Sequence, residues 1–251
     1  MPQTNPQRRR GRKKKSVLFT PLAFVLVCAA LIFGMSVFFR ATNIEVTGAD
    51  NYAPEEIIAA SGIETGDNLV FTDRAGAASK IMAKLPYIES AAVHRTLPNT
   101  ITIEVRESSA LAYIAVDGEL WALDHSCKAL SKTTSAQTEG LIRVIGLEAD
   151  KPAVGEIITG RDAESAKIEY LASILKELSL RSMNGGVGTV DMTNLADPTF
   201  DYIGRFQVKL GKNENVDYKL DRLLSVLELL DEGDSGTLDL SIDERVHFSQ
   251  G

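Results

Sequence analysis

The pattern of hydrophobic and polar positions separates one long apolar run from a longer segment of alternating short elements. Residues 17–39 carry no charged side chain, and almost all of them are apolar. A helix of this length is about 34 Å long, enough to cross a hydrocarbon core of about 30 Å. The pattern therefore predicts a single transmembrane helix over residues 17–39, with the folded part of the protein after it.

A basic tail, residues 1–16, precedes the apolar run. It contains seven of the 27 Lys and Arg residues and none of the 34 acidic ones, namely Arg8, Arg9, Arg10, Arg12, Lys13, Lys14 and Lys15. Placing one such charge at the bilayer centre costs roughly 2.5–3.5 kcal/mol, so the tail does not enter the membrane. Basic segments next to a membrane helix stay on the cytoplasmic side. We expect these residues to set a topology with a disordered cytoplasmic N-terminus and the bulk of the chain outside. Orientation and contact with anionic lipid account for the charge, so we expect no nucleic-acid partner.

A cleaved signal peptide is the main alternative for the apolar run. Such a peptide has an apolar region of roughly 7–15 residues followed by a site of small residues. Here the run is longer, and it ends in Val37-Phe38-Phe39-Arg40 without such a site. The sequence therefore favours an uncleaved membrane anchor.

The segment after the anchor, residues 40–108, has the element order β-α-α-β-β. Alternating positions predict strands, and Pro54, Gly62 and Pro86 mark helix boundaries. The expected elements are strands 43–47, 90–95 and 100–106 and helices 54–61 and 74–84, with a hairpin turn at 97–99.

The remaining segment, residues 109–251, mixes short strands with two helices. The helices are predicted by apolar residues at helical spacing, and the strands by alternation. The expected elements are helices 162–180 and 215–230 and strands 111–116, 120–123, 142–145, 188–192, 199–203 and 206–210, with a loop at 124–140. The whole chain is therefore predicted as α+β: one transmembrane helix, a βααββ domain, and a mixed β domain with two helices packed on a sheet.

The last predicted strand, residues 238–248, has the clearest alternation of the chain. Its even positions are apolar except for Glu244, where a bend or bulge would fit. An edge strand offers unpaired backbone groups that a partner strand can satisfy. Periodicity alone leaves two interpretations open, a covered core strand and a partner-binding edge.

No combination of residues indicates catalysis. His94, His125 and His247 lie on different elements, and the two cysteines, Cys28 and Cys127, fall on opposite sides of the membrane boundary and cannot pair. A membrane-anchored serine peptidase of the signal-peptidase kind shares this topology, but it needs a serine just beyond the anchor and a lysine base. The first serine there, Ser61, falls in a helix. We expect no enzyme, no metal, no cofactor and no small-molecule substrate.

Three stretches of residues 40–108 together resemble a POTRA domain of the FtsQ/DivIB cell-division family. They are I-E-V-T-G, P-E-E-I-I-A-A-S-G-I-E-T-G-D-N-L and K-L-P-Y-I-E-S-A-A-V-H-R-T-L-P-N-T-I-T-I-E-V-R-E. Farther on, D-G-E-L-W-A-L-D and the closing L-D-L-S-I-D are similar to the family's β domain. The resemblance covers nearly the whole chain in the family's order, with a basic tail and an anchor in front.

The resemblance implies a non-catalytic divisome scaffold at the septum of the bacterial cell membrane. Its expected partners are small single-pass coiled-coil proteins of the FtsB/DivIC and FtsL types, bound by strand addition to the last strands. The partner-binding residues implied in this way are Leu238, Leu240, Ile242, Glu244, Arg245, Val246 and Phe248. The chain departs from the family pattern at Ile242 and at the charged Glu244-Arg245 pair, so a more charged partner surface is expected. A general extracytoplasmic envelope-binding protein is the alternative function.

Overall fold

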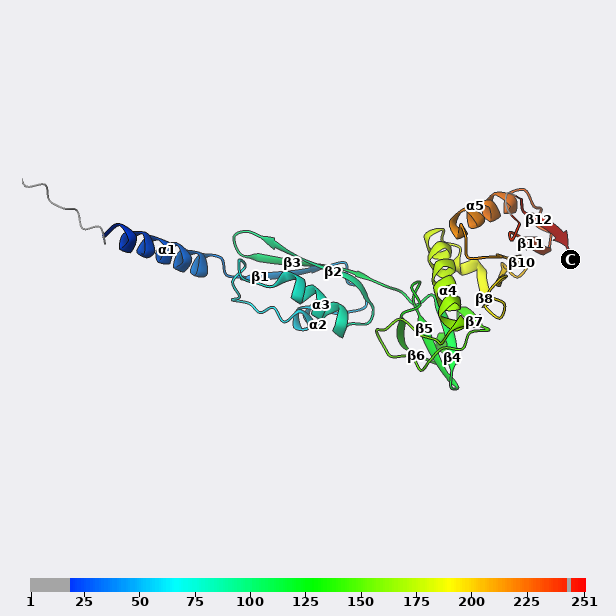
Figure 1. Cartoon of the computed structure of the whole chain (residues 1–251), viewed down its shortest axis with the longest axis horizontal. Coiled ribbons are helices and arrows are strands. Elements are labelled where there is room, and N and C mark those ends of the chain that lie inside the picture. The colour runs from blue at the N-terminus through cyan, green and yellow to red at the C-terminus, as the bar shows by residue number, and fades with distance from the viewer. Residues whose placement is uncertain (1–18, 243–244) are drawn as a thin grey trace, which may run out of the picture.

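A computed structural model describes residues 19–242 and 245–251 of the chain. A helix, a small α+β domain and a larger α+β domain follow one another along the long axis of the molecule (Figure 1). The basic residues Arg8–Lys15, predicted to set the topology, and Glu244, predicted to bind the partner, lie outside the described residues.

The first helix, α1 (Phe19–Phe38), carries apolar side chains that are mostly exposed. Within the described residues, no helix combines the length and hydropathy that crossing a membrane requires. The predicted span over residues 17–39, two of which lie outside the described part, is therefore not confirmed.

The small domain has the predicted β-α-α-β-β order. Its elements are β1 (Asn43–Thr47), α2 (Pro54–Ser61), α3 (Arg74–Lys84), β2 (Ile88–Thr96) and β3 (Thr100–Glu107). The sheet order is β1-β3-β2, in which β1 runs parallel and β2 antiparallel to β3. Gly62 ends α2 with a left-handed φ of 71°, as its position after the helix predicted. Buried apolar residues of both helices and of β2 and β3, including Ile57, Ile81 and Ile103, form the domain's core, and partly buried residues of β1 pack against it.

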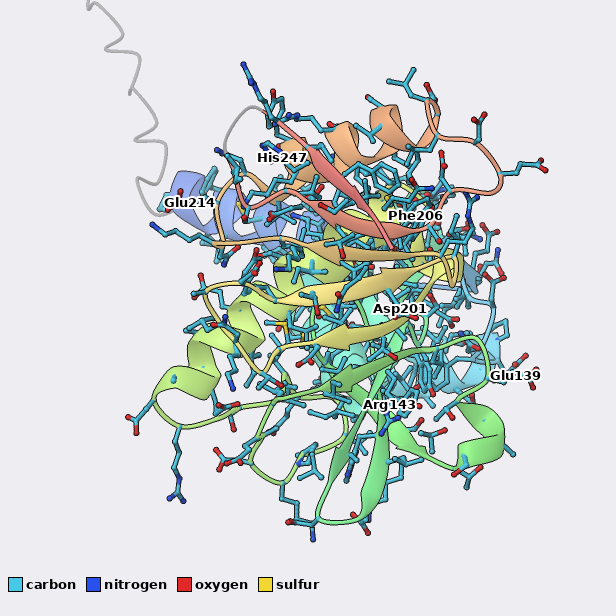
Figure 2. The ribbon with its side chains drawn as sticks, turned by 90° about the vertical axis from the view of Figure 1, so that its right-hand side faces the viewer. Glu139, Arg143, Asp201, Phe206, Glu214 and His247 are labelled. Atoms are coloured by element: carbon cyan, nitrogen blue, oxygen red, sulfur yellow. The ribbon has the colours of Figure 1, made fainter. Side chains whose placement is uncertain are left out.

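The larger domain is built on a nine-stranded sheet, in the order β12-β11-β10-β9-β8-β7-β4-β5-β6. Its strands are β4 (Ala112–Val116), β5 (Glu119–Leu123), β6 (Ala129–Thr133), β7 (Ile142–Ile145), β8 (Val187–Asp191), β9 (Thr199–Tyr202), β10 (Phe206–Lys209), β11 (Gly236–Asp239) and β12 (His247–Gln250). The long helices α4 (Ala163–Leu180) and α5 (Val216–Leu227) pack on one face, and the short 3-10 turns are η1 (Ser135–Gln137) and η2 (Asn184–Gly186). Figure 2 views the sheet from the side on which Arg143 and Asp201 lie, with β12 at the upper end. The α+β class and the two helices on a sheet are confirmed.

The predicted loop 124–140 is wrong in part, because it contains β6 and η1. Strand β6 has only two buried apolar residues, Ala129 and Leu130, which is too few for a pattern to be visible. The strand forms because β5 provides an antiparallel neighbour across a short turn. This pairing is not encoded in the alternation of β6 itself.

The predicted single strand 238–248 is also wrong, because the segment forms two antiparallel strands, β11 and β12. The Asp239 carboxylate accepts hydrogen bonds from the Ser241 N–H (2.9 Å) and hydroxyl (2.6 Å). Such a local bond competes with strand pairing and turns the chain. Leu238 and Phe248 then face each other across the pair, so the alternation continues on one face although the strand does not.

Candidate partner-binding site

The nine-stranded sheet has two edges, and the β6 edge is covered. The Ala129 N–H donates to the Glu156 carbonyl (2.8 Å), and the Gly155 N–H donates to the Ala129 carbonyl (2.7 Å). One step earlier, the Ile158 N–H donates to the Cys127 carbonyl (3.0 Å). The loop that carries residues 155–158 therefore occupies the backbone groups at which a partner strand would begin to pair.

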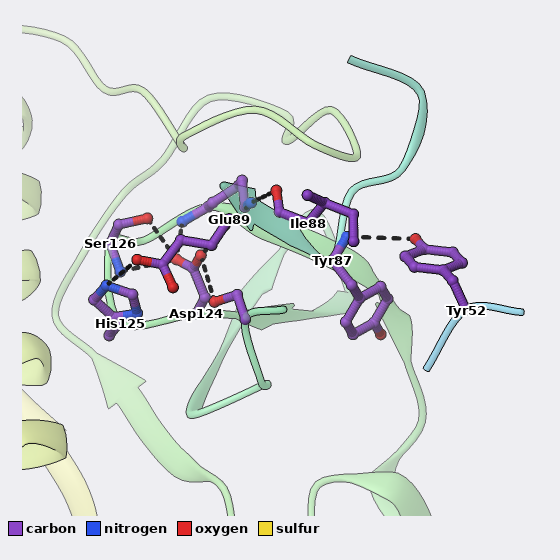
Figure 3. A network of polar contacts seen from close by, with 9 residues as sticks. Tyr52, Tyr87, Ile88, Glu89, Asp124, His125 and Ser126 are labelled. Atoms are coloured by element: carbon purple, nitrogen blue, oxygen red, sulfur yellow. Dashed lines mark hydrogen bonds and ion pairs between the residues drawn. The ribbon is translucent and has the colours of Figure 1, made fainter. Parts of the chain in front are cut away.

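The small domain also lies against this edge (Figure 3). The Tyr87 and Ser131 hydroxyls are 3.1 Å apart, and the Lys128 ammonium donates to the Ile88 carbonyl (3.2 Å). The His125 Nε2 and Glu89 Oε1 atoms are 3.9 Å apart. These contacts tie β6 and the turn before it to the start of β2 and to Tyr87 just before it, so the covered edge forms the junction between the two domains.

A buried carboxylate, Asp124, holds the turn that leads into β6. It is fully buried, and it accepts hydrogen bonds from the Ser108 hydroxyl (2.9 Å), the Ser126 N–H (2.8 Å) and hydroxyl (2.7 Å), and the Lys128 N–H (2.9 Å). These four donors satisfy the lone pairs of the carboxylate, which is the condition for burying such a charge. The turn is therefore fixed from inside the protein.

The opposite edge, β12, has a neighbour on one side only. It pairs with β11, and no strand of the described residues lies along its outer side. The Gly251 N–H donates to the Ser235 carbonyl (3.0 Å). Because bonded and non-bonded residues alternate in antiparallel pairs, Ser249 and His247 also bond to β11. The N–H and C=O groups of Phe248 and Gln250 therefore point outward, where a further strand could pair.

The two faces of β12 differ in polarity. On the helix side, Phe248 is partly buried and its ring lies 6.2 Å from that of Phe206 in an edge-to-face arrangement. Val246 and Leu230 are likewise partly buried against the same core. On the opposite face, His247 and Ser249 are exposed. An added strand would therefore meet an apolar surface on the helix side and solvent on the other.

A buried lysine on α5, Lys219, fixes the turn after β10, close to this edge. Its ammonium donates to the carbonyls of Leu210 (2.8 Å) and Lys212 (2.7 Å). The Tyr170 hydroxyl donates to the carbonyls of Gly211 and Lys212, both at 3.0 Å, and burial raises the pKa of this phenol. The turn after β10 is thus fixed, and its Gly211 packs against Ser241 beyond β11, where a Cβ would lie only 2.7 Å from the Ser241 Cα.

The predicted partner-binding residues do not form one surface. Leu238 and Leu240 are buried in the core and cannot meet a partner. Ile242, which is 50% exposed, and the exposed Arg245 lie in the connection between β11 and β12. Of the predicted set, Val246 and Phe248 lie at the open edge, and Glu244 is outside the described residues.

Sequence reasoning missed Gln250, whose outward backbone groups lie at the open edge. The alternation of apolar residues ends at Phe248, and the polar Ser249-Gln250 pair that follows has no pattern of its own. A hairpin signal between β11 and β12 would have located it, but the connecting residues contain no short Gly or Asn turn.

The residues considered for catalysis have structural contacts. The Ser61 hydroxyl donates to the Ile58 carbonyl (2.6 Å) and accepts from the Ile63 N–H (3.0 Å), both close to the end of α2. Cys127 is fully buried, and this burial raises the pKa of its thiol, which disfavours the reactive thiolate. Within residues 19–242 and 245–251, no group of three His, Cys, Asp or Glu side chains is placed to hold a metal ion.

Comparison with known proteins identifies relatives along most of the chain. Residues 39–108 match the family model for a POTRA domain of the FtsQ type. The chain is 28% identical to the cell division protein DivIB of Clostridium botulinum strain Hall over 239 residues, covering 94% of this chain and 91% of the relative. It is 32% identical to the cell division protein FtsQ of Corynebacterium glutamicum over 160 residues, covering 61% of this chain and 63% of that relative. It is 24% identical to DivIB of Bacillus subtilis over 177 residues, or 70% of this chain and 64% of the relative.

Proposed function

Because the chain belongs to the FtsQ/DivIB family of cell-division proteins, we propose that it is a non-catalytic scaffold of the bacterial division machinery at the septum. Its partners are small single-pass coiled-coil division proteins of the FtsB/DivIC and FtsL types. The names of the relatives support the division role, and the family resemblance supports the class of partner.

The observation that carries the binding proposal is the contrast between the two edges of the nine-stranded sheet. The β6 edge is occupied by residues 155–158 and by the small domain, whereas β12 has no strand on its outer side within the described residues. The partner adds an extended segment to β12, using the backbone groups of Phe248 and Gln250. Main-chain hydrogen bonds supply affinity in this mode, and alternate side chains supply specificity.

The polarity of β12 defines the partner segment. Its residues on the helix side are apolar, because they lie beside Phe248, Val246 and Leu230. Its residues on the other side are polar, because they lie beside His247 and Ser249 in solvent. The segment therefore alternates between apolar and polar positions over about four residues, the length of β12.

We also propose that α1 attaches the protein to the cytoplasmic membrane, with the N-terminus inside and the two domains outside. Support comes from its apolar surface, which no other described residue covers and whose exposure to water is unfavourable. The exposed side chains are Leu22, Phe24, Val25, Leu26, Val27, Leu31, Ile32, Phe33, Met35, Val37 and Phe38. The seven basic residues of the tail favour this orientation.

The binding proposal is tested by removing one outward backbone donor. Gln250→Pro deletes the outward N–H without deleting a bond to β11, since proline is tolerated on edge strands with its ring toward solvent. Loss of one hydrogen bond and steric hindrance to pairing predict an affinity for the FtsB/DivIC-type partner about tenfold lower, which corresponds to about 1.4 kcal/mol. Affinity is measured with the full-length chain and the partner's extracytoplasmic segment in detergent.

The matched control is Gln250→Ala, which removes the side chain and keeps the N–H. Its affinity should stay close to that of the parent chain. Equal binding by the proline and alanine variants, with unchanged circular dichroism, would exclude strand addition at this position. For the division role, a fluorescent tag on the N-terminus should give a band at the constriction site, whereas uniform signal around the envelope would favour the general envelope-binding alternative.

A further inference from the structure

The small domain exposes two large apolar side chains far more than the rest of its surface. Phe71 is 67% exposed and Leu97 is 64% exposed, while the next large apolar residue of this domain, Met82, is 40% exposed. Phe71 lies in the loop before α3, and Leu97 lies in the turn between β2 and β3. Neither side chain contributes to the core of its domain.

Both segments are hydrogen-bonded to the short link between α1 and β1, residues 39–42. The Leu69 N–H donates to the Phe39 carbonyl (2.8 Å), and the Asn68 amide donates to the Met35 carbonyl in the last turn of α1 (3.1 Å). The Thr42 N–H donates to the Asn99 carbonyl (2.9 Å), two residues beyond Leu97. Phe71 and Leu97 therefore lie at the end of the domain that meets α1, where the loops face the helix (Figure 1).

These loops present their apolar side chains from a fixed backbone. The Val70 N–H donates to the Asn68 side-chain oxygen (2.9 Å), and the Phe71 N–H donates to the Asn68 carbonyl (3.1 Å). The Arg95 guanidinium, on β2, donates to the Thr72 carbonyl (2.8 Å) and so joins the hairpin to the loop that carries Phe71. An apolar residue held outward by its neighbours' hydrogen bonds is a feature of binding surfaces rather than of a mobile loop.

This end of the domain carries charges of both signs, and its two exposed arginines are long enough to reach lipid phosphates. Arg40 and Arg74 are exposed and form no ion pair within the described residues. The nearby Asp67 and Asp73 carboxylates accept hydrogen bonds from the backbone N–H groups of Glu64 (2.9 Å) and Gly76 (3.0 Å). Free arginines beside exposed apolar side chains are the combination that binds the interface of an anionic bilayer.

We propose that this end of the small domain rests on the outer surface of the membrane, with Phe71 and Leu97 inserted past the head groups into the first part of the acyl region and Arg40 and Arg74 on the phosphates. The proposal rests on the proposed attachment by α1, because the helix brings this surface to the bilayer. The surface fixes the angle at which the chain leaves the membrane, and thereby the direction in which the larger domain and its open edge are presented.

The test uses the full-length chain in vesicles of phosphatidylcholine and phosphatidylglycerol, prepared with normal or brominated acyl chains. Tryptophan is introduced by Phe71→Trp or Leu97→Trp, with Met82→Trp as the matched control on α3. The native Trp121 is buried in the larger domain, and its emission in the parent chain provides the baseline. Bromine quenches only indoles that reach the acyl region.

We expect the added emission of the Phe71→Trp and Leu97→Trp variants to shift to the blue and to lose most of its intensity in brominated vesicles. The added emission of the Met82→Trp variant should remain that of an indole in water and should not be quenched. Adding the double substitution Arg40→Gln and Arg74→Gln to the Phe71→Trp variant should reduce the quenching.

Flotation of the same samples separates the two proposals. If the chain does not float with the vesicles, attachment by α1 is wrong. If it floats and the Phe71→Trp and Leu97→Trp emissions match that of the Met82→Trp control, the membrane-surface proposal is overturned and the patch is available to a protein partner instead.

Discussion

The two edges of the nine-stranded sheet differ in what lies against them. At β6, residues 155–158 bond to the strand and the small domain contacts it through Tyr87. At β12, the outward groups of Phe248 and Gln250 have no strand beside them within the described residues. The same sheet therefore ends once in an internal junction and once in an open edge.

The difference shows how one architecture manages exposed edges. An unpaired edge is a general hazard, because any extended chain can pair with it. Here the edge nearer the small domain is used to fix the two domains together, and the open edge is only four residues long. Each edge is also supported by one buried charge, Asp124 at β6 and Lys219 near β12. Replacing these charges tests how strongly each edge depends on its support.

The largest effect is expected from Asp124→Ala. The substitution leaves the Ser108 hydroxyl and the Ser126 and Lys128 N–H groups without their buried acceptor. Loss of a buried, multiply bonded charge predicts a decrease of about 3–5 kcal/mol in the free energy of unfolding. Urea unfolding of the chain in detergent measures this decrease.

The control, Asp150→Ala, removes an exposed carboxylate and should change stability by less than about 0.5 kcal/mol. A similar loss in both variants would show that Asp124 does not support the covered edge.

A smaller effect is expected from Lys219→Met at the other edge. The methionine keeps the length and the apolar stem of the side chain but withdraws the donor from the Leu210 and Lys212 carbonyls. The Tyr170 hydroxyl still donates to the Lys212 carbonyl, so we expect a loss of about 2–3 kcal/mol. Urea unfolding compares it with Lys176→Met, an exposed lysine on α4. If Lys219→Met unfolds at the same urea concentration as its control, the turn after β10 is held by Tyr170 alone.

Sequence patterns predicted most of the elements, and their success depended on local signals. Helix α3 has the predicted bounds, Arg74–Lys84, because Asp73 caps its start and Leu85-Pro86 ends it. Strand β7 also has its predicted bounds, Ile142–Ile145. In both cases the information lies within a few residues of the element.

The open edge was predicted in the right segment but with the wrong geometry. The alternation from Leu238 to Phe248 predicts one strand, whereas Asp239 and Ser241 turn the chain and start a hairpin. Alternation reports which face of a sheet a residue occupies, and it is unchanged when the chain reverses direction on the same face. Which backbone groups are left open depends on pairing between strands, so Gln250 could not be found from its own sequence.

A more modest prediction concerns the contact between the domains at the covered edge. Tyr87→Phe removes the hydroxyl that lies 3.1 Å from Ser131, and Ser131→Ala removes its partner. A single hydrogen bond predicts a loss of about 1 kcal/mol for either variant. In urea unfolding, the double variant should lose little more than each single one, because both remove the same bond. Fully additive losses would mean that the two hydroxyls do not interact in solution.

The smallest effect concerns pH at the open edge, through Asp239 on β11. Partial burial acts to raise the pKa of Asp239, but hydrogen bonds from the Ser241 side chain and N–H, with the charges of Lys209 and His247, leave this pKa lowered from its ordinary value of 3.8. A carboxylate with a lowered pKa in the folded state stabilises the fold above the unfolded pKa, and this contribution is lost as the pH falls through the folded pKa. Asp239→Asn should therefore be less stable than the parent chain at neutral pH, and the difference should begin to shrink near the ordinary pKa of 3.8 and vanish only below the lowered pKa of the folded state. Thermal unfolding at a series of pH values measures this difference. The comparison at the covered edge is Glu119→Gln. The hydrogen bond from Lys132 lowers the pKa of Glu119, but this side chain is 43% exposed and its ion pair lies at the surface, so added salt should weaken its effect more than that of Asp239. A stability difference for Asp239→Asn that stays constant from neutral to acidic pH would show that this carboxylate acts through packing and not through its charge.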